Sequence, residues 1–275
     1  MTFKTQKFGI IQGRLSTAPA GELQYFPFEN WEGEFSAATK LGYDYIELLI
    51  ERDDKPTNPF WVNGGSGIVS AVDRANLTIY TVCSDYVIDH SLFAPDNEFV
   101  FDHTLSTLHR CAKIGAKALI LPLLEQSDCS LYSITRIGEV LRTVADTASS
   151  LGITVLLETL LTADDLLSLL LEINNPVVKV VFDTGNRINL TSNLSHEIMR
   201  LSSHIGHVHI KDKNVANENV LLGTGRVNFR EVAEALNIIG FDKSFAFETT
   251  RGKDPLRTAK FHLDFWKYYW SEAKS

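Results

Sequence analysis

The stretch LGITVLLE, residues 151–158, decides the fold of this chain. A glycine directly after a helical pattern is typical of a helix end, because glycine adopts the left-handed conformation that closes the last turn. The apolar residues after this glycine have the character of a buried strand. The same helix–glycine–strand junction recurs as LGYDYIEL at 41–48, IGAKALIL at 114–121 and IGFDKSFAFE at 239–248. These four junctions predict short loops that lead from helices into parallel strands.

Outward from these junctions, short apolar runs alternate with longer amphipathic stretches eight times. The strand-like runs are residues 8–12, 45–49, 77–84, 118–123, 153–158, 177–183, 207–211 and 244–248. The clearest helical stretches are residues 31–41, 99–114, 131–150, 163–173, 228–239 and 255–269. Strands that alternate with helices predict βαβ units and a parallel sheet.

Eight such units fit either a closed barrel or an open doubly wound sheet. An open sheet often has a glycine-rich phosphate turn after its first strand, whereas here that strand is followed by Gly13, Arg14 and Leu15. A closed barrel typically needs about 250 residues, and the chain has 275. We therefore predict an α/β protein with one domain over residues 1–275, a single (β/α)8 TIM barrel with its active site at the C-terminal ends of the strands.

Charge and cysteine content narrow the class of protein. The formal net charge of −8 disfavours a partner with a phosphate backbone, because nucleic-acid-binding proteins usually present a basic face. No run approaches the roughly 18 apolar residues of a membrane span. The three cysteines, Cys83, Cys111 and Cys129, are odd in number and widely spaced, which favours reduced thiols over a disulfide framework. We expect a cytoplasmic protein with no nucleic-acid or membrane partner.

The last four strand-like runs bring polar side chains to their C-terminal ends. These are Glu158, Asp183, His209 and Glu248. Side chains two residues apart share a face of a strand, so each of the four points inward while its large apolar neighbours face the helices. Four strands with the same alternation indicate one cluster at the barrel mouth.

Three carboxylates in one buried cluster repel one another, and a divalent cation relieves this repulsion. Oxygen-rich ligation with one imidazole suits Mn²⁺ or Mg²⁺, with Co²⁺ or Zn²⁺ as alternatives. The competing interpretation is a set of unrelated ion pairs at loop starts. The common position on four adjacent strands favours the metal site.

The sequence around these four residues resembles the xylose-isomerase-like TIM-barrel superfamily, most closely its sugar isomerase/epimerase branch, which includes the ketose 3-epimerases. The resemblance is carried by the four residues and by the segments FDTGN at 182–186, HVHIKD at 207–212 and LGTGRVNF at 222–229. The resemblance implies that Glu158, Asp183, His209 and Glu248 bind Mn²⁺, Mg²⁺ or Co²⁺, and that the two glutamates also transfer protons. It also implies a carbohydrate substrate and a homodimer or homotetramer. One departure is that such 3-epimerases usually carry a histidine shortly after the aspartate, where this chain has Asn186 and Arg187.

The chemistry that follows is metal-dependent isomerisation or epimerisation through an enediolate, with one carboxylate on each side of the substrate. A dehydratase of a keto-polyol is the alternative, since enolisation followed by elimination uses the same groups. A related endonuclease of abasic DNA needs more histidines for its zinc ions, and a non-catalytic binding barrel is a third class.

Further side chains are expected to line the substrate cavity: Gln12 and Arg14 at the first strand, Glu47 at the end of the second, His90 after the third, Asn186 after the sixth, Lys211 at the end of the seventh and Arg226 after it. Lys211 either holds a substrate oxygen or neutralises Asp183 or Glu248. Arg14 and Arg226 are candidates for an anionic substrate group, with a surface role as the alternative for Arg226. Asp212 either orients a ligand or caps a turn.

Overall fold

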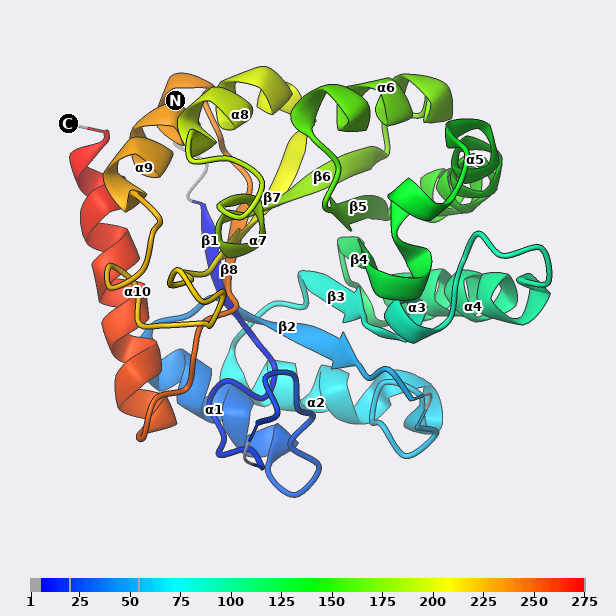
Figure 1. Ribbon diagram of the computed structural model, residues 1–275. Helices are drawn as coiled ribbons and strands as arrows, with labels where there is room; N and C mark the ends of the chain where they lie inside the picture. The colour runs from blue at the N-terminus through cyan, green and yellow to red at the C-terminus, as the bar shows by residue number, and fades with distance from the viewer. Residues whose placement is uncertain (1–5, 20, 54, 275) are drawn as a thin grey trace, which may run out of the picture. The chain divides into compact units, whose positions relative to one another are not determined.

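The computed structural model of the chain describes residues 6–19, 21–53 and 55–274. Its parallel strands follow one another in chain order around a closed barrel (Figure 1), which confirms the predicted (β/α)8 TIM-barrel fold class. The strands are β1 (Lys7–Ile11), β2 (Tyr45–Ile50), β3 (Thr81–Ser84), β4 (Ala118–Leu123), β5 (Thr154–Thr159), β6 (Val178–Asp183), β7 (Ile205–Ile210) and β8 (Ser244–Phe247).

Helices follow the strands along the chain. They are α1 (Trp31–Leu41), α2 (Ser66–Ala75), α3 (Tyr86–Asp89), α4 (Glu98–Ile114), α5 (Ile134–Leu151), α6 (Ala163–Ile173), α7 (Thr184–Arg187), α8 (Leu194–Leu201), α9 (Phe229–Ile238) and α10 (Pro255–Glu272). Short 3-10 turns occupy Val62–Gly65, Glu125–Ser127, Cys129–Leu131 and Ser202–His204. No helix in the described ranges has both the length and the apolar character needed to cross a membrane.

The four predicted helix-ending glycines have positive φ values. Gly42, Gly115 and Gly152 cap α1, α4 and α5 at φ values of 91°, 82° and 67°, and Gly240 follows α9 at 66°. The left-handed conformation closes each helix, so these junctions are confirmed.

Two predicted strand boundaries were wrong. The run 77–84 yields a strand only from Thr81, because Leu77 still donates its N–H to the Val72 carbonyl and so completes the end of α2. Glu47 lies inside β2 rather than at its end, because the strand continues to Ile50, which pairs with Ser84 of β3.

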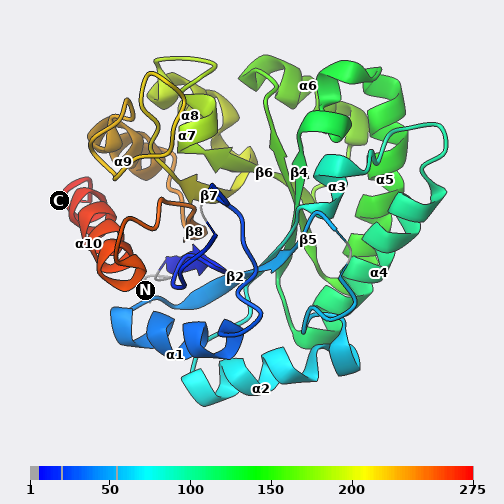
Figure 2. The ribbon, with the colours of Figure 1, turned by 60° about the horizontal axis from the view of Figure 1, so that its bottom comes forward.

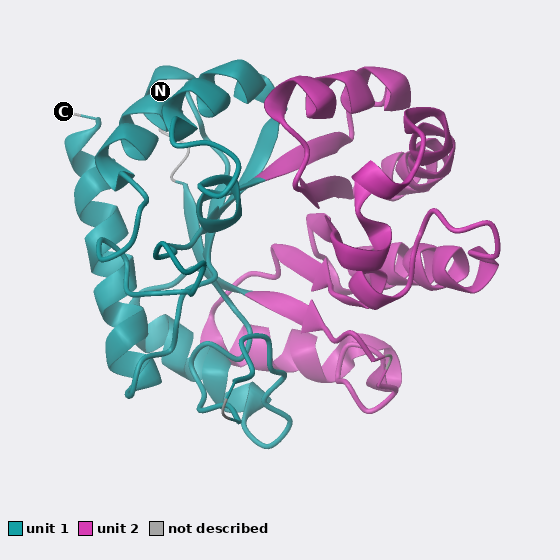
Figure 3. Ribbon diagram, in the orientation of Figure 1, with its two compact units in different colours: residues 1–46, 182–275 teal, residues 47–181 magenta. Residues whose placement is uncertain are grey.

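Chain contacts divide the protein into two compact units (Figure 3). Unit 1 contains residues 1–46 and 182–275, and unit 2 contains residues 47–181. The boundaries fall within β2 and β6, so that β6 delivers its last residue, Asp183, to unit 1.

In unit 1, β8 pairs on one side with β1 and on the other with β7, and α9 packs against α10 (Figure 2). Phe245 of β8 packs against Trp266 of α10, with ring centroids 5.2 Å apart. Gly9 of β1 must lack a side chain, since a Cβ there would lie 2.2 Å from the ring of Tyr45. The Tyr45 hydroxyl in turn donates to the Phe245 carbonyl at 2.9 Å. The sheet of unit 1 is therefore tightly packed below the strand ends.

In unit 2, β2 to β6 pair in sequence, and α5 lies between α4 and α6. A buried apolar cluster lies on one face of this sheet and consists of Cys83, Ala118, Ile120, Leu156 and Val181. Leu156 and Val181 are the residues expected to point inward two positions before Glu158 and Asp183. Their shared cluster confirms the predicted alternation on β5 and β6.

Candidate functional site

Three of the predicted ligands meet at strand ends of unit 1. Asp183 ends β6, His209 is the fifth residue of β7, and Glu248 directly follows β8. Their exposed fractions are 1%, 1% and 5%. The Nδ1 atom of His209 lies 3.8 Å from Oδ2 of Asp183 and 3.4 Å from Oε2 of Glu248. Two carboxylate oxygens and one imidazole nitrogen therefore converge on one buried point.

Lys211 supplies a positive charge at this point. Its Nζ atom lies 2.8 Å from Oδ2 of Asp183 and 2.6 Å from Oε2 of Glu248, and the side chain is buried. The two carboxylates are thus arranged around a single cation, which here is an ammonium group. Of the two roles expected for Lys211, neutralisation of these carboxylates is the one observed.

Asp183 is held in place by the backbone that follows it. The side chain caps α7, and its Oδ1 atom accepts hydrogen bonds from the N–H groups of Gly185 and Asn186, each at 2.8 Å. This use of Oδ1 leaves Oδ2 directed toward Lys211. The segment 182–186 therefore orients one ligand oxygen by local backbone geometry.

Glu248 is held from both sides. Its Oε1 atom accepts a hydrogen bond from Nε2 of Gln24 at 3.2 Å and lies 3.8 Å from the guanidinium of Arg14. Burial alone would raise the pKa of Glu248, but the nearby cations, Lys211 foremost, hold this pKa well below its usual range. Glu248 is therefore a carboxylate at neutral pH, with Oε2 directed toward the ligand cluster.

The loop after β1 and the helix α1 that follows it each contribute one residue that the sequence analysis did not predict. The side-chain oxygen of Gln24 accepts a hydrogen bond from Arg14 at 2.8 Å, and its Nε2 atom donates a hydrogen bond to Glu248. Glu34 of α1 is buried and accepts the N–H groups of Gly13 at 2.7 Å and Leu15 at 3.0 Å. Burial raises the pKa of Glu34, and the hydrogen bonds from the loop partly oppose the rise. Glu34 lies on the buried face of α1, together with Ala38 four residues later. An acid at helical spacing from apolar residues is the sequence signal that could have predicted its burial.

Glu158 and Glu47 belong to unit 2. Glu158 lies next to the end of β5, is buried, and pairs in register with Pro122 of β4. Glu47 accepts a hydrogen bond from the hydroxyl of Thr81 at 2.6 Å. Their roles as metal ligand and substrate contact stay predictions.

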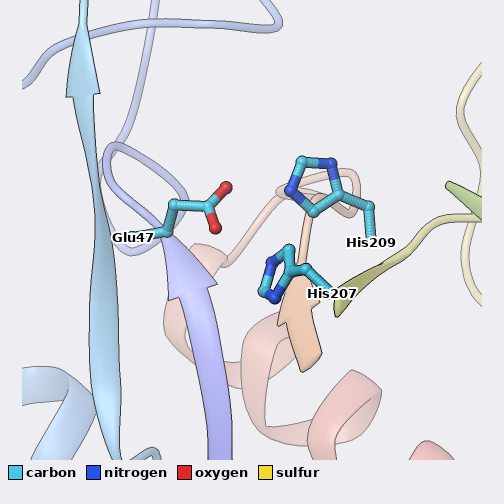
Figure 4. A group of neighbouring side chains, drawn as sticks. All are labelled: Glu47, His207 and His209. Carbon is cyan, nitrogen blue, oxygen red and sulfur yellow. The ribbon is translucent and has the colours of Figure 1, made fainter. Parts of the chain in front are cut away.

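Two imidazoles project from β7, and Figure 4 shows them, His207 and His209, together with Glu47 on β2. The ring centroids of the two histidines lie 5.1 Å apart. Nδ1 of His207 shares a hydrogen bond with the Ser244 hydroxyl at 2.7 Å. His207 and Ser244 therefore lie on the same face of the sheet as His209, as the alternation predicts.

The remaining predicted contacts lie in loops. Arg14 is buried and donates to the Leu23 carbonyl as well as to Gln24. Arg226 is exposed and donates to the Ile188 carbonyl and to Asn189. Through these hydrogen bonds both arginines fix the conformation of loops. Contact of either arginine with an anionic substrate stays a prediction.

Partners are observed for three further candidates, Asn186, His90 and Asp212. The side-chain oxygen of Asn186 lies 3.5 Å from Nζ of Lys211. His90 stacks on Tyr86, with ring centroids 4.2 Å apart, and Gln12 is buried at the end of β1. Asp212 accepts three backbone N–H groups, from residues 223, 225 and 227, which gives it the turn-capping role.

A family model described as xylose isomerase-like TIM barrel matches residues 35–269 of the chain. A ketose 3-epimerase of Arthrobacter globiformis is 30% identical over 137 residues, which are 47% of this chain and 46% of that protein. Another curated relative is matched over 34% of its length, so the chain aligns with less than half of either protein.

Two solved structures share the fold along nearly the whole chain. D-Psicose 3-epimerase from Clostridium cellulolyticum H10 has a TM-score of 0.77 at 20% identity, covering 96% of this chain and 99% of that one. An L-ribulose 3-epimerase has a TM-score of 0.80 at 18% identity, covering 98% and 96%. At this identity the likeness establishes the fold.

Proposed function

Because the chain belongs to the xylose isomerase-like TIM barrel family, we propose that it is a metal-dependent isomerase or epimerase of a sugar or sugar derivative. The observation that carries the proposal is the convergence of Asp183, His209 and Glu248 at buried strand ends. The names of the ketose 3-epimerase relative and of the two solved epimerases support a carbohydrate substrate.

We propose that Glu158 completes the ligand set. Its strand pairs with β6 in parallel, with Leu157 level with Val180, so both strands run toward the edge that carries Asp183. Three carboxylates, which are hard oxygen ligands, together with one imidazole suit Mn²⁺, with Mg²⁺, Co²⁺ or Zn²⁺ as alternatives. The ammonium of Lys211 between two of the carboxylates supports the fit of a cation at this point. When bound, the metal supplies positive charge that stabilises negative charge on the oxygens of a sugar.

The proposed reaction moves a proton at the carbon next to the sugar carbonyl. Glu248, ionised because its pKa is lowered, takes or returns the proton on one face of the substrate, and Glu158 acts on the other face. Gln24 and Arg14 contact Oε1 of Glu248 and so fix the orientation of its carboxylate. Lys211 and Asn186 donate hydrogen bonds to oxygens of the substrate and of the enediolate.

Proton exchange into D₂O tests this proposal. With Mn²⁺ and a series of ketoses, NMR should show deuterium entering next to the carbonyl without loss of water, whereas a dehydratase would release a deoxy product. Glu248→Gln should abolish exchange, and Glu231→Gln, on the exposed side of α9, should preserve it. If no ketose exchanged a proton, the proposal would fail. The cytoplasmic location and a homodimer or homotetramer stay predictions.

A further inference from the structure

A cavity lies in unit 1 among the loops that follow the strands. It has a volume of about 680 Å³ and is lined by parts of three loops, residues 17–19 and 21–23 after β1, 218–219 after β7, and 250–253 and 255 after β8. Pockets of roughly 300–1,000 Å³ are typical of small-molecule sites. We call it the outer cavity.

The outer cavity shares its wall with the residues that hold Glu248. Leu23 lines the cavity, and its carbonyl accepts a hydrogen bond from Arg14, while the next residue, Gln24, donates to Glu248. Thr250 lines it two residues after Glu248. A ligand in the outer cavity would therefore lie next to the chain segments that carry the proposed proton-transfer group.

The wall is held in a fixed shape by Arg251. Its Nε atom donates to the Gly13 carbonyl at 2.7 Å and its Nη1 atom to the Glu22 carbonyl at 2.9 Å, which joins the loop after β8 to the loop after β1. Gly13 adopts a φ of 86°, and a Cβ there would lie 1.9 Å from the Tyr25 carbonyl oxygen. These contacts favour a preformed cavity over a gap between mobile loops.

The lining suits an uncharged, hydroxylated ligand. The lining contains two acids, Glu22 and Glu218, and two bases, Arg251 and Lys253, so the formal charges cancel. Arg251 already uses its Nε and Nη1 donors on two carbonyls, which leaves fewer of its donors for a phosphate or carboxylate. Apolar and hydroxyl groups complete the wall: Ala18, Pro19, Leu23, Pro255, Thr17 and Thr250. A sugar ring presents apolar C–H faces and hydroxyls that both donate and accept, which matches this mixture.

We propose that the outer cavity binds a second, uncharged sugar ring, so that the substrate is a glycosylated ketose with its ketose part at the metal centre. This inference rests on the proposed function, since it assigns the reacting ring to the Glu248 site. The outer cavity then sets specificity, because it binds the part of the substrate that does not react.

The test compares fructose with 6-O-glucosyl-fructose in the D₂O exchange assay, with Mn²⁺ present. The wild type should show a kcat/KM for the glucosylated ketose that is about tenfold or more above that for fructose. Ala18→Trp, which places an indole ring in the outer cavity and blocks part of it, should reduce this ratio to near one. Ala216→Trp, at an exposed position that does not line the outer cavity, is the matched control and should keep the ratio. Melting curves establish that both variants fold.

A binding measurement separates failure of this inference from failure of the proposed function. 6-O-Glucosyl-sorbitol cannot enolise, so its binding, measured by calorimetry, requires no chemistry. It should bind the wild type and the control at least about tenfold more tightly than Ala18→Trp. Equal binding by all three proteins, or equal kcat/KM for fructose and its glucosyl derivative, would overturn the inference. If binding follows the prediction but neither sugar exchanges a proton, the proposed function fails and the cavity assignment stands.

Discussion

Replacing Lys211 by methionine is expected to tighten Mn²⁺ binding. The Lys211 ammonium lies 2.8 Å from Asp183 and 2.6 Å from Glu248, at the oxygens that a metal would use. A metal ion must therefore displace the ammonium from these oxygens. Close charge pairs couple by about 1.5 kcal/mol or more, so loss of even one ion pair costs the wild type about tenfold in metal affinity, and loss of both about a hundredfold. Methionine removes this competition and keeps the apolar part of the side chain.

Calorimetric titration of the chelator-treated protein with MnCl₂ measures the effect. Lys211→Met should lower the Kd for Mn²⁺ by about 10- to 100-fold. Lys213→Met is the matched control, because Lys213 lies two residues away and its Nζ atom donates to Asn217 at 2.9 Å. The control removes the same charge and should leave the Kd close to that of the wild type. If Lys211→Met bound Mn²⁺ as the wild type does, or more weakly, the ammonium would not compete with the metal and the reasoning would be refuted.

Three further changes test other parts of the structure. Gln24→Ala should lower kcat about tenfold, because Glu248 loses the donor that orients it, with little change in KM for the substrate that the exchange assay identifies. A proportional rise in KM would argue instead that Gln24 contacts the substrate. Glu34→Gln should lower the free energy of unfolding by about 1–3 kcal/mol in urea titrations, since its amide N–H₂ would face one of two buried backbone N–H groups; wild-type stability would contradict this. Burial lowers the pKa of His262 to about 4, so between pH 6.5 and 4 the unfolded chain binds the extra proton and stability falls as the pH falls. His262→Leu should therefore reduce the difference in unfolding free energy between pH 7 and pH 5 by about 2 kcal/mol, and an unchanged difference would refute this pKa.

The repeating parts of the fold follow from the sequence because they depend on local chemistry. Gly42, Gly115 and Gly152 each close a helix with a positive φ. This conformation is required by the end of the helix itself and not by a contact with another element. The alternation of inward and outward side chains on β5 and β6 likewise follows from the strand geometry. The inward residues Leu156 and Val181 belong to the same buried apolar cluster. These features could be predicted without knowledge of distant contacts.

The supports of the site could not be predicted in this way. Gln24 reaches Glu248 across 224 residues of sequence, and this contact depends on the path of the loop after β1. The sequence placed Lys211 near the carboxylates, but only the side-chain geometry shows that one ammonium contacts both. Glu47 was misplaced because the apolar residues after it continue β2 by three positions. Loop path and side-chain direction are set by tertiary packing, and a single sequence does not encode them as a local pattern.

We propose that one divalent cation binds at the ends of β5 to β8. Anomalous diffraction from crystals soaked in MnCl₂ tests it most directly. We predict one manganese peak coordinated by Glu158, Asp183, His209 and Glu248, with the Lys211 ammonium moved off the two carboxylates. An absence of manganese from this point, or a peak that Glu158 does not coordinate, would contradict the account.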